Sequence, residues 1–473
     1  MFSENHHYVD ASRVYDVMVV GGGNAALCAA MTARENGASV LVLECSPKDF
    51  RGGNSRHTRN IRYMHESANR HMSGPYLKDE FWEDLLRITK GETNEELARY
   101  LIRKSLNINE WMEDRGCVFQ PSMKGTLSLS RTNGFFLGGG KALINAYYAT
   151  AEKLGIDIVY GAEVMDLKIR DGLFESAEVH IGRVPRILKA KTIVLACGGI
   201  QSNTDFLEEH WGEAGKNFII RGTPYDRGRM LKVMFKNGAK PIGDPTQCHA
   251  VAIDARAPKF DGGIITRLDC IPFGIVVNHE IKRFYDEGEE FWPKRYAIWG
   301  RLVAAQPQQI AYSLIDSKSL ELFMPSCFPP IEADTIGNLA IKLGLDPNKL
   351  KQTVNEFNSA VQPGTFNKDE LDDCCTKGLE PKKSHWARKL DTPPYYAYPL
   401  RPGITFTYLS VVVNESAQVI MEDGKPFKNI FAAGEIMSGN ILGQGYMAGF
   451  GMTIGSVFGR IAGKEAAACH QQS

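Results

Sequence analysis

The feature that most constrains this chain is a glycine-rich turn between a strand and a helix near its N-terminus. A run of strand-forming residues leads into the spacing G-x-G-x-x-[G/A], with Gly21, Gly23 and Ala26 at the small positions, and an alanine-rich helix follows. Gly21 permits the tight turn, Gly23 lets the backbone approach a pyrophosphate, and Ala26 lets helix and strand pack closely. We expect Asn24 and Ala25, which start the helix, to face the phosphates. The turn predicts a bound dinucleotide; a turn that serves only helix packing is the alternative.

A second apolar strand supports the dinucleotide interpretation. Residues 39–43 are followed by Glu44 and Cys45, and Glu44 lies 21 residues beyond Gly23. A carboxylate at this distance accepts a hydrogen bond from a ribose 2′-hydroxyl and disfavours a 2′-phosphate. We therefore expect Glu44 and Cys45 to contact the cofactor.

Charge balance and cysteine usage limit the function classes. Basic and acidic residues number 55 each, which gives no indication of a nucleic-acid or anionic-membrane partner. The ten cysteines are spread along the chain without a C-x-x-C pair, which is typical of reduced thiols and predicts no metal site.

The first ten residues lack an apolar signal core, and no run approaches the roughly 18 apolar residues of a membrane helix. We expect a cytoplasmic protein that is not embedded in a membrane.

A basic, glycine-led loop follows the second strand. Residues 51–62 contain four arginines and one histidine, and this position lies at the sheet edge where ligands bind in a nucleotide fold. Arg56 and His57 offer positive charge to a substrate, with a solvated basic loop as the alternative. Arg131, in a second glycine-rich stretch, is either a substrate contact or a surface residue. The residues of the first loop that we expect to contact the cofactor are Gly52, Gly53, Asn54 and Ser55.

Later strands return to the same edge of the predicted sheet. The apolar run 192–195 leads into Ala-Cys-Gly-Gly, and residues 429–435 form a strand that ends in glycine and glutamate. Residues 157–160, 163–169 and 177–181 are predicted to be short strands of a meander, and a helix from residue 452 directs its N-terminus at the cofactor. The further cofactor contacts expected from these segments are Val164, Ala196, Gly198, Gly434, Glu435, Gly451 and Met452.

The middle of the chain differs in composition from both ends. Between residues 248 and 390 prolines increase, strands shorten, and a helix-rich part lies at 334–360. A chain of 473 residues is expected to form two or three domains. We predict an α/β fold in which residues 1–247 and 391–473 form a Rossmann-like domain, a parallel sheet with a β-meander. Residues 248–390 form an inserted α+β capping domain, and the prolines after residue 391 suit a return linker.

Several separated motifs, in order, together resemble the flavoproteins of the fumarate reductase/succinate dehydrogenase family. The match spans nearly the whole chain. Besides the glycine turn, Glu44 and the loop at 52–55, the matching segments are Gln247-Cys-His249, Val276-Val-Asn278, Arg283-Phe284, Ala433-Gly-Glu435 and Gly459-Arg-Ile-Ala-Gly463.

The resemblance implies an FAD-binding domain, a mobile cap, and hydride transfer from substrate to flavin N5. FAD is expected to be non-covalent, because His57 lies a few positions from the histidine that links flavin in succinate dehydrogenases. His249 and Thr266 match the family's carboxylate-binding residues. Arg295 is the candidate for the arginine that handles the substrate proton.

Three positions depart from the family pattern. Residues 405–408 (Thr-Phe-Thr-Tyr) stand where a second histidine is usual, Tyr446 replaces a carboxylate-binding arginine, and Arg267 replaces an acidic residue. Tyr446 is our second catalytic candidate, as a general acid/base or a donor to a substrate oxygen; a packed tyrosine is the alternative. The family binds the two ends of its substrate with two groups of residues, here called carboxylate poles, and the pole that contains His249 and Thr266 is kept. The arginines available to rebuild the other are Arg56, Arg59, Arg131 and Arg267.

These residues predict an FAD-dependent dehydrogenase that desaturates a small polycarboxylate at Cα–Cβ. The sequence has no iron–sulfur cysteine spacing and no haem motif, so we expect electrons to leave through another partner or oxygen. The resemblance implies a separate redox protein as the electron acceptor. The alternatives are an ene-reductase that runs the reaction in reverse, a dehydrogenase of a ketone-bearing ring, and an FAD-binding protein without activity.

Overall fold

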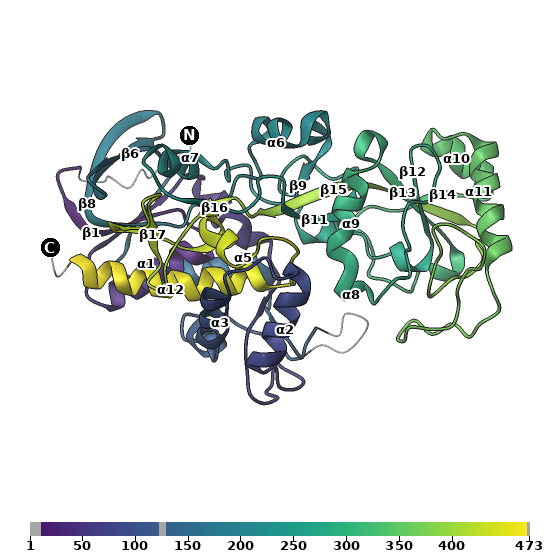
Figure 1. Ribbon diagram of the computed structural model, residues 1–473, viewed down its shortest axis with the longest axis horizontal. Helices are drawn as coiled ribbons and strands as arrows, with labels where there is room; N and C mark the ends of the chain where they lie inside the picture. The colour runs from purple at the N-terminus through teal and green to yellow at the C-terminus, as the bar shows by residue number, and fades with distance from the viewer. Residues whose placement is uncertain (1–10, 123–128, 471–473) are drawn as a thin grey trace, which may run out of the picture.

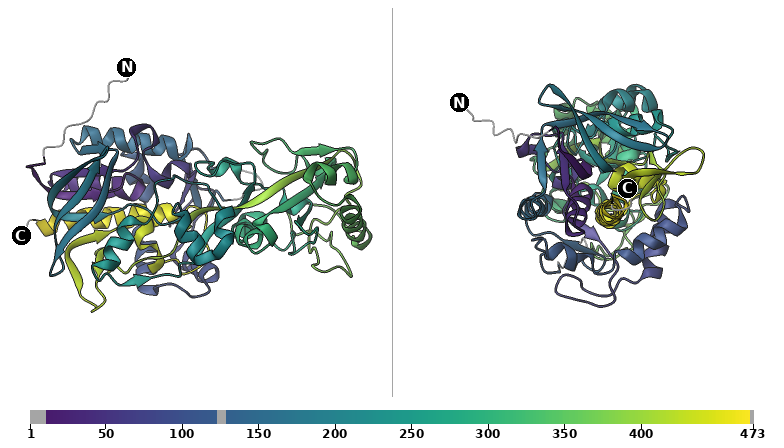
Figure 2. Two further views of the ribbon diagram at one scale, coloured as in Figure 1. Left: turned by 90° about the horizontal axis from the view of Figure 1, so that it is seen from above. Right: turned by 90° about the vertical axis from the view of Figure 1, so that its left-hand side faces the viewer.

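The computed structural model describes residues 11–122 and 129–470 and builds them around two main β-sheets at opposite ends of an elongated molecule (Figure 1). The long strand β15 (Tyr395–Thr407) runs lengthwise from the first body into the second (Figure 2). Within the described residues, no helix is both long and apolar enough to cross a bilayer.

The first sheet is mostly parallel. Its main path consists, in spatial order, of β17 (Gln418–Ile420), β18 (Pro426–Ala432), β8 (Val184–Leu195), β1 (Val14–Val20), β2 (Val40–Glu44) and β5 (Asp157–Tyr160). β1 pairs in parallel with β2 and β8, and β5 and β18 extend the sheet in parallel on either side. Apolar strands buried on both faces are typical of parallel sheets. The predicted α/β fold is confirmed.

The meander differs from the sequence prediction in one strand. It consists of β6 (Ala162–Arg170), β7 (Leu173–Ile181) and β8, paired antiparallel. Residues 157–160, predicted to belong to it, instead pair in parallel with β2, where Ile158 lies opposite Val42. Short apolar strands carry little information about their partners, because the same pattern suits either neighbour.

Small residues let two helices pack closely over this sheet. In α1 (Asn24–Glu35) and α12 (Phe450–His470), a Cβ at Gly459 would lie 2.5 Å from the carbonyl oxygen of Ala25. The other helices of this part are α2 (Lys78–Thr89), α3 (Glu95–Lys104), α4 (Ile108–Glu113), α5 (Gly139–Lys153), α6 (Thr204–Trp211) and α7 (Arg229–Lys236). Two short ribbons pair β3 (Asn60–Arg62) with β4 (Asn133–Phe135) and β10 (Pro241–Ile242) with β16 (Ser410–Val411).

The second sheet is organised around β15. Its other strands are β9 (Ile219–Ile220), β11 (Cys248–Asp254), β12 (Ile275–Asn278), β13 (Ala311–Asp316) and β14 (Ile331–Ala333). Its helices are α8 (Trp292–Arg295), α9 (Trp299–Ala304), α10 (Ile336–Leu343) and α11 (Pro347–Ala360). β9 and β15 lie outside the limits 248 and 390 predicted for the cap, yet both pair within this sheet. The division into domains at those limits remains a prediction.

Candidate active site

One large cavity lies where the carboxyl ends of the parallel strands approach the second sheet. Residues at the ends of β1, β2, β8 and β18 line it, together with the loop 53–60 and parts of β11 and β15. It encloses about 1660 Å³, including space that opens to solvent. Ligands of open α/β sheets bind at this edge.

Nearly all of the expected cofactor contacts line this cavity. The exception is Gly52, whose N–H donates to Oε2 of Glu44 at 3.4 Å. A Cβ at Gly52 would lie 2.7 Å from Cγ2 of Ile144, so glycine at this position allows the loop to pack against Ile144. The expected contacts that do line the cavity are Gly21, Gly23, Asn24, Ala25, Glu44, Cys45, Gly53, Asn54, Ser55, Val164, Ala196, Gly198, Gly434, Glu435, Gly451 and Met452.

The glycine turn opens the N-terminus of α1 into the cavity. Gly21 has φ of 111°, and a Cβ there would lie 2.3 Å from the carbonyl oxygen of Ala196. Gly23 is the N-cap, and no side chain caps the helix there. The N–H of Asn24 donates to Oγ of Ser55 at 3.0 Å, which ties the loop 53–57 to the helix start. A glycine cradle at an uncapped helix N-terminus fits the phosphates of a dinucleotide.

Glu44 lies buried at the end of β2, as a ribose-binding carboxylate should. One carboxylate oxygen accepts a hydrogen bond from the N–H of Ser46 at 2.9 Å. Burial raises the pKa of Glu44 above its usual value. A Cβ at Gly22 would lie 2.2 Å from Oε2 of Glu44, so the turn and the carboxylate are fitted to each other.

Two further carboxylates, Asp226 and Glu435, lie buried at the end of β8. The side-chain amide of Gln201 donates to Asp226 at 2.9 Å and to Glu435 at 3.4 Å. The N–H of Thr407 donates to Glu435 at 2.8 Å. Burial raises the pKa of Glu435 to about 8, and burial together with the charge of Glu435 raises that of Asp226 well above its usual range.

The other end of the cavity is cationic. Arg59, Arg221 and Arg267 line it beside His249. Burial, followed by the positive charge of Arg267, lowers the pKa of both Arg59 and Arg221 to about 10. Buried atoms without a hydrogen-bond partner include Nε and Nη1 of Arg221 and Nδ1 of His249. Buried polar atoms left without partners in a cavity indicate a ligand that supplies them.

Arg267 differs from the other two arginines because it has a counter-ion. Its guanidinium pairs with Asp269, with Nε to Oδ1 at 2.7 Å and Nη2 to Oδ2 at 2.8 Å. It also lies 4.7 Å above the ring of Tyr296. Burial opposes the charge, but Asp269 outweighs it and raises the pKa of Arg267. Arg267 is therefore held in one orientation.

His249 and Tyr446 stack at the cationic end, with ring centroids 3.8 Å apart and 11° between the planes. Burial and the charges of Arg221 and Arg267 lower the pKa of His249 well below its usual value, so the imidazole is neutral. The hydroxyl of Tyr446 accepts a hydrogen bond from the N–H of Gly451, within the first turn of α12, at 3.3 Å. Burial raises the pKa of this phenol.

His57 also lines the cavity, where its Nε2 lies 2.7 Å from Oδ1 of Asp261. Burial lowers the pKa of His57 although Asp261 opposes the shift. This contact joins the loop 53–57 to the segment that follows β11.

Four of the residues predicted to bind substrate or to catalyse do not line the cavity. Thr266 is buried, but its hydroxyl donates to the carbonyl of Gly263 at 2.9 Å. Arg56 donates to the carbonyl of Asp49 at 3.3 Å. The remaining two, Arg131 and Arg295, each form an ion pair elsewhere.

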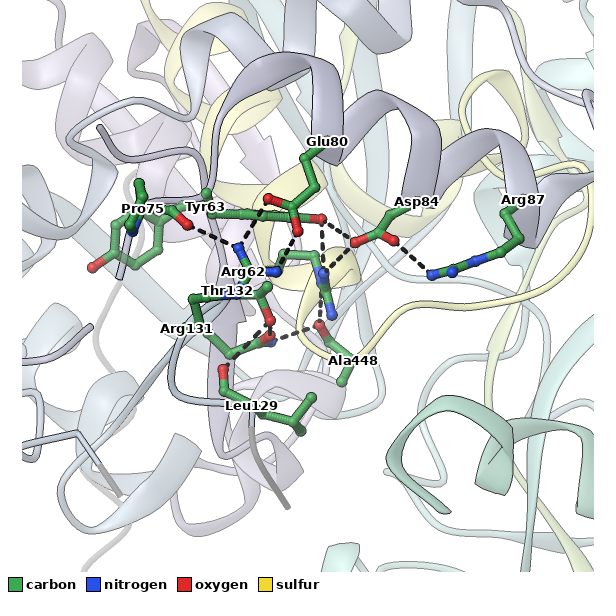
Figure 3. Close-up of polar contacts among 12 residues, drawn as sticks. Arg62, Tyr63, Pro75, Glu80, Asp84, Arg87, Leu129, Arg131, Thr132 and Ala448 are labelled. Carbon is green, nitrogen blue, oxygen red and sulfur yellow. Dashed lines mark hydrogen bonds and ion pairs between the residues drawn. The ribbon is translucent and has the colours of Figure 1, made fainter. Parts of the chain in front are cut away.

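Arg131 pairs with Glu80 on α2 and donates to the carbonyl of Pro75 at 2.9 Å (Figure 3). Arg295 pairs with Glu289 at 2.6 Å and donates to the hydroxyl of Tyr285 at 2.9 Å. Neither arginine lines the cavity, because nearby carboxylates hold their guanidinium groups, and their roles in binding substrate and in catalysis stay predictions.

A buried cluster beside Arg131 supports the segment that carries Tyr446. Arg62 donates to the hydroxyl of Tyr76 at 2.8 Å and lies 3.5 Å from Asp84 (Figure 3). Its Nε donates to the carbonyl of Ala448 at 3.2 Å, and the side chain of Asn133 donates to the same carbonyl at 2.7 Å. Two buried side chains thus hold the carbonyl of Ala448, two residues after Tyr446.

Arg221 and Tyr296 were not anticipated from the sequence. Arg221 follows a strand of two residues, and no motif surrounds it. Arg59 and Arg267 were among the arginines proposed to rebuild the second carboxylate pole. Arg59, Arg221 and Arg267 come from separate segments of the chain, and only the fold brings their side chains together at the cationic end of the cavity.

Comparison with known proteins decides the family. A family model described as an FAD binding domain matches residues 16–451. The chain belongs to this FAD-binding family. FAD is therefore its cofactor, which the glycine cradle, the helix N-terminus and Glu44 fit, and the chain is an FAD-dependent oxidoreductase.

Curated relatives of this FAD-binding family cover most of the chain. It is 26% identical to an NADH:fumarate oxidoreductase of Klebsiella pneumoniae over 97% of the chain and 48% of that protein, so it spans about half of that relative. It is also 26% identical to a probable fumarate reductase, Ifc3, of Shewanella frigidimarina over 96% of the chain and 75% of that protein. A digoxin reductase of Eggerthella lenta is 25% identical over 97% of the chain and 88% of that protein.

Solved structures of the same fold span nearly the whole chain. The open conformation of a flavocytochrome c3 fumarate reductase superposes with a TM-score of 0.78 at 23% identity, over 97% of this chain and 79% of that one. A 3-ketosteroid-Δ4-(5α)-dehydrogenase of Rhodococcus jostii RHA1 superposes with a TM-score of 0.73 at 20% identity, over 98% of this chain and 99% of that one. These similarities establish that this chain has the same fold as the two enzymes.

Proposed function

We propose that this flavoprotein desaturates a small polycarboxylate at its Cα–Cβ bond. The observation that carries the proposal is that Arg59, Arg221 and Arg267 line the same cavity as the expected FAD contacts. Carboxylates are the natural partners of guanidinium groups in a dry site. A neutral substrate would leave this charge buried and uncompensated, which is costly.

Tricarballylate, oxidised to cis-aconitate, is the substrate we favour. Segments of the chain resemble tricarballylate dehydrogenase, namely residues 51–60, 131–133, 138–143 and 292–301.

The reaction removes a proton from Cα and a hydride, with its electron pair, from Cβ. FAD, when bound, accepts the hydride. The arginines hold the carboxylates and stabilise the enolate charge that develops as the Cα proton leaves. We assign the transfer of that proton, or a hydrogen bond to a substrate oxygen, to Tyr446, which lines the cavity. Arg295 retains its proposed role in proton transfer on the strength of the family resemblance alone.

A ring substrate is the second candidate. Tyr446 and Tyr296 both line the cavity, one relative is a digoxin reductase, and a structure of the same fold is a 3-ketosteroid dehydrogenase. The buried arginines argue against this candidate, because a ketone-bearing ring offers no charge to pair with them. An ene-reductase acting on the unsaturated polycarboxylate would use the same contacts in the reverse direction. We also propose that a separate redox protein exchanges electrons with the flavin.

Turnover assays separate these candidates. The proposal predicts reduction of an artificial electron acceptor with tricarballylate, and much slower oxidation of reduced viologen with fumarate. A faster reaction with viologen and an unsaturated carboxylate would reassign the chain as an ene-reductase. Activity only with ketosteroids would exclude a polycarboxylate substrate.

A further inference from the structure

Two of the three cavity arginines carry positive charge that no described side chain neutralises. Asp269 balances Arg267, but neither Arg59 nor Arg221 forms an ion pair with a described carboxylate. His249 is neutral, and His57 has Asp261 as its own partner. The cationic end therefore presents two uncompensated positive charges.

Arg221 is fixed in place by its backbone. Its N–H donates to the carbonyl of Ile404 in β15 at 2.9 Å, and its carbonyl accepts from the N–H of Gly263 at 2.8 Å. Arg221 as a whole is only 6% exposed, and the buried Nε and Nη1 of its side chain have no hydrogen-bond partner. Arg221 thus combines a fixed backbone position with buried donors that have no partner, and the planar fork of a guanidinium matches the two oxygens of a carboxylate.

We infer that Arg221 forms a second carboxylate subsite, in addition to the one expected at His249, and that this subsite makes the cavity select ligands with at least two negative charges. This inference rests on the proposed function and deepens it by assigning the specificity for charge to one residue. A monocarboxylate would fill one pole and leave a buried arginine unpaired, and such an unpaired charge is expensive.

Ligand binding without turnover tests the subsite. The probes are acetate, malonate and citrate, which carry increasing negative charge and have no bond that the proposed reaction desaturates. Each is titrated into the oxidised holoprotein, and the shift of the flavin absorption band reports binding. The unmodified protein should bind malonate and citrate more tightly than acetate. In Arg221→Gln, malonate and citrate should bind at least about 30-fold more weakly, and their advantage over acetate should disappear.

Two further variants control for folding and general charge. Arg115→Gln removes an arginine that pairs with Glu35 outside the cavity, so it should leave all three affinities unchanged. Arg221→Lys keeps the charge without the fork of donors, so it should weaken malonate binding but keep the preference over acetate. If Arg221→Gln does not retain FAD, Arg221→Lys carries the test, and an unchanged malonate affinity in that variant would overturn the inference.

Two results would overturn the inference: equal weakening of all three probes by Arg221→Gln, or no weakening of any. A wrong proposed function would give a different pattern of results from a wrong assignment of the subsite. In that case the charge preference depends on Arg221 as described, but tricarballylate is not oxidised.

Discussion

The imidazole of His249 lies flat against the phenol of Tyr446, with centroids 3.8 Å apart and planes 11° from parallel. His249 comes from β11 in the second sheet, and Tyr446 comes from the segment before α12. The stack therefore joins the two halves of the cavity. It also places a phenol hydroxyl, bonded to the N–H of Gly451, among the arginines.

Removing the hydroxyl of Tyr446 tests its chemical role. Tyr446→Phe keeps the ring and the stack, so substrate affinity should change little. If the hydroxyl transfers a proton or donates to a substrate oxygen, kcat should fall by roughly 10²- to 10⁴-fold. Steady-state kinetics with tricarballylate measure both values.

Tyr160→Phe is the matched control, because its hydroxyl is buried without a partner and lies outside the cavity. It should leave kcat unchanged. A kcat for Tyr446→Phe within about threefold of the unmodified protein would mean that Tyr446 only packs.

FAD retention should depend on the space around Gly21, and not merely on its backbone angle. Gly21→Ala places a Cβ 2.3 Å from the carbonyl oxygen of Ala196 and should abolish copurification of flavin. Gly37→Ala is the control, since Gly37 also has a positive φ, of 90°, but has nothing within 4 Å. The flavin absorbance per chain measures the outcome. Equal flavin loss in both variants would attribute the effect to backbone strain alone.

The raised pKa of Glu435 predicts a pH dependence of stability. Burial raises this pKa to about 8, so the folded protein binds more protons than the unfolded chain between the usual glutamate pKa and 8. The free energy of unfolding of the flavin-free protein should therefore fall as pH rises through this window.

Glu435→Gln removes the titration and should flatten that slope, as measured by urea unfolding across the pH range. Asp226 titrates in the same direction, so part of the slope should persist in the variant. An unchanged slope would show that Glu435 ionises at its ordinary pKa.

Arg295 is expected to act only after it leaves Glu289. Both side chains of this ion pair are about one-third exposed, at 34% and 38%, so breaking it should cost about 1 kcal/mol or less. Arg295→Gln should lower kcat by at least roughly 100-fold if the guanidinium handles the substrate proton. Glu289→Gln, which frees Arg295 without removing it, should retain activity. Full activity of Arg295→Gln would remove this arginine from the mechanism.

The cofactor half of the site could be predicted because its signals are local. Most of the expected contacts follow a strand or start a helix, and parallel strands bring those ends to one edge. β15 was harder to anticipate. Pro393 and Pro394 suggested a return linker, because paired prolines suit an extended crossing segment. The strand begins directly after them at Tyr395, and even Pro399 and Pro402 lie opposite Tyr312 and Ala252 in the sheet.

The substrate half could be predicted only in part because its charges converge through tertiary structure. Arg56 and Arg131 were chosen for their glycine-rich surroundings, but Arg131 has a carboxylate neighbour in Glu80 that its local sequence does not reveal. Arg221 has no local signal at all. The sequence indicated that arginines replace the missing carboxylate-binding residues of the family. Which arginines line the cavity is decided by the fold.

An anaerobic titration of the FAD-loaded protein with tricarballylate tests the central claim most directly. We predict that the oxidised flavin band bleaches and that one unsaturated tricarboxylate forms for each flavin reduced. The claim is contradicted if dithionite bleaches the flavin but neither tricarballylate nor any other di- or tricarboxylate does.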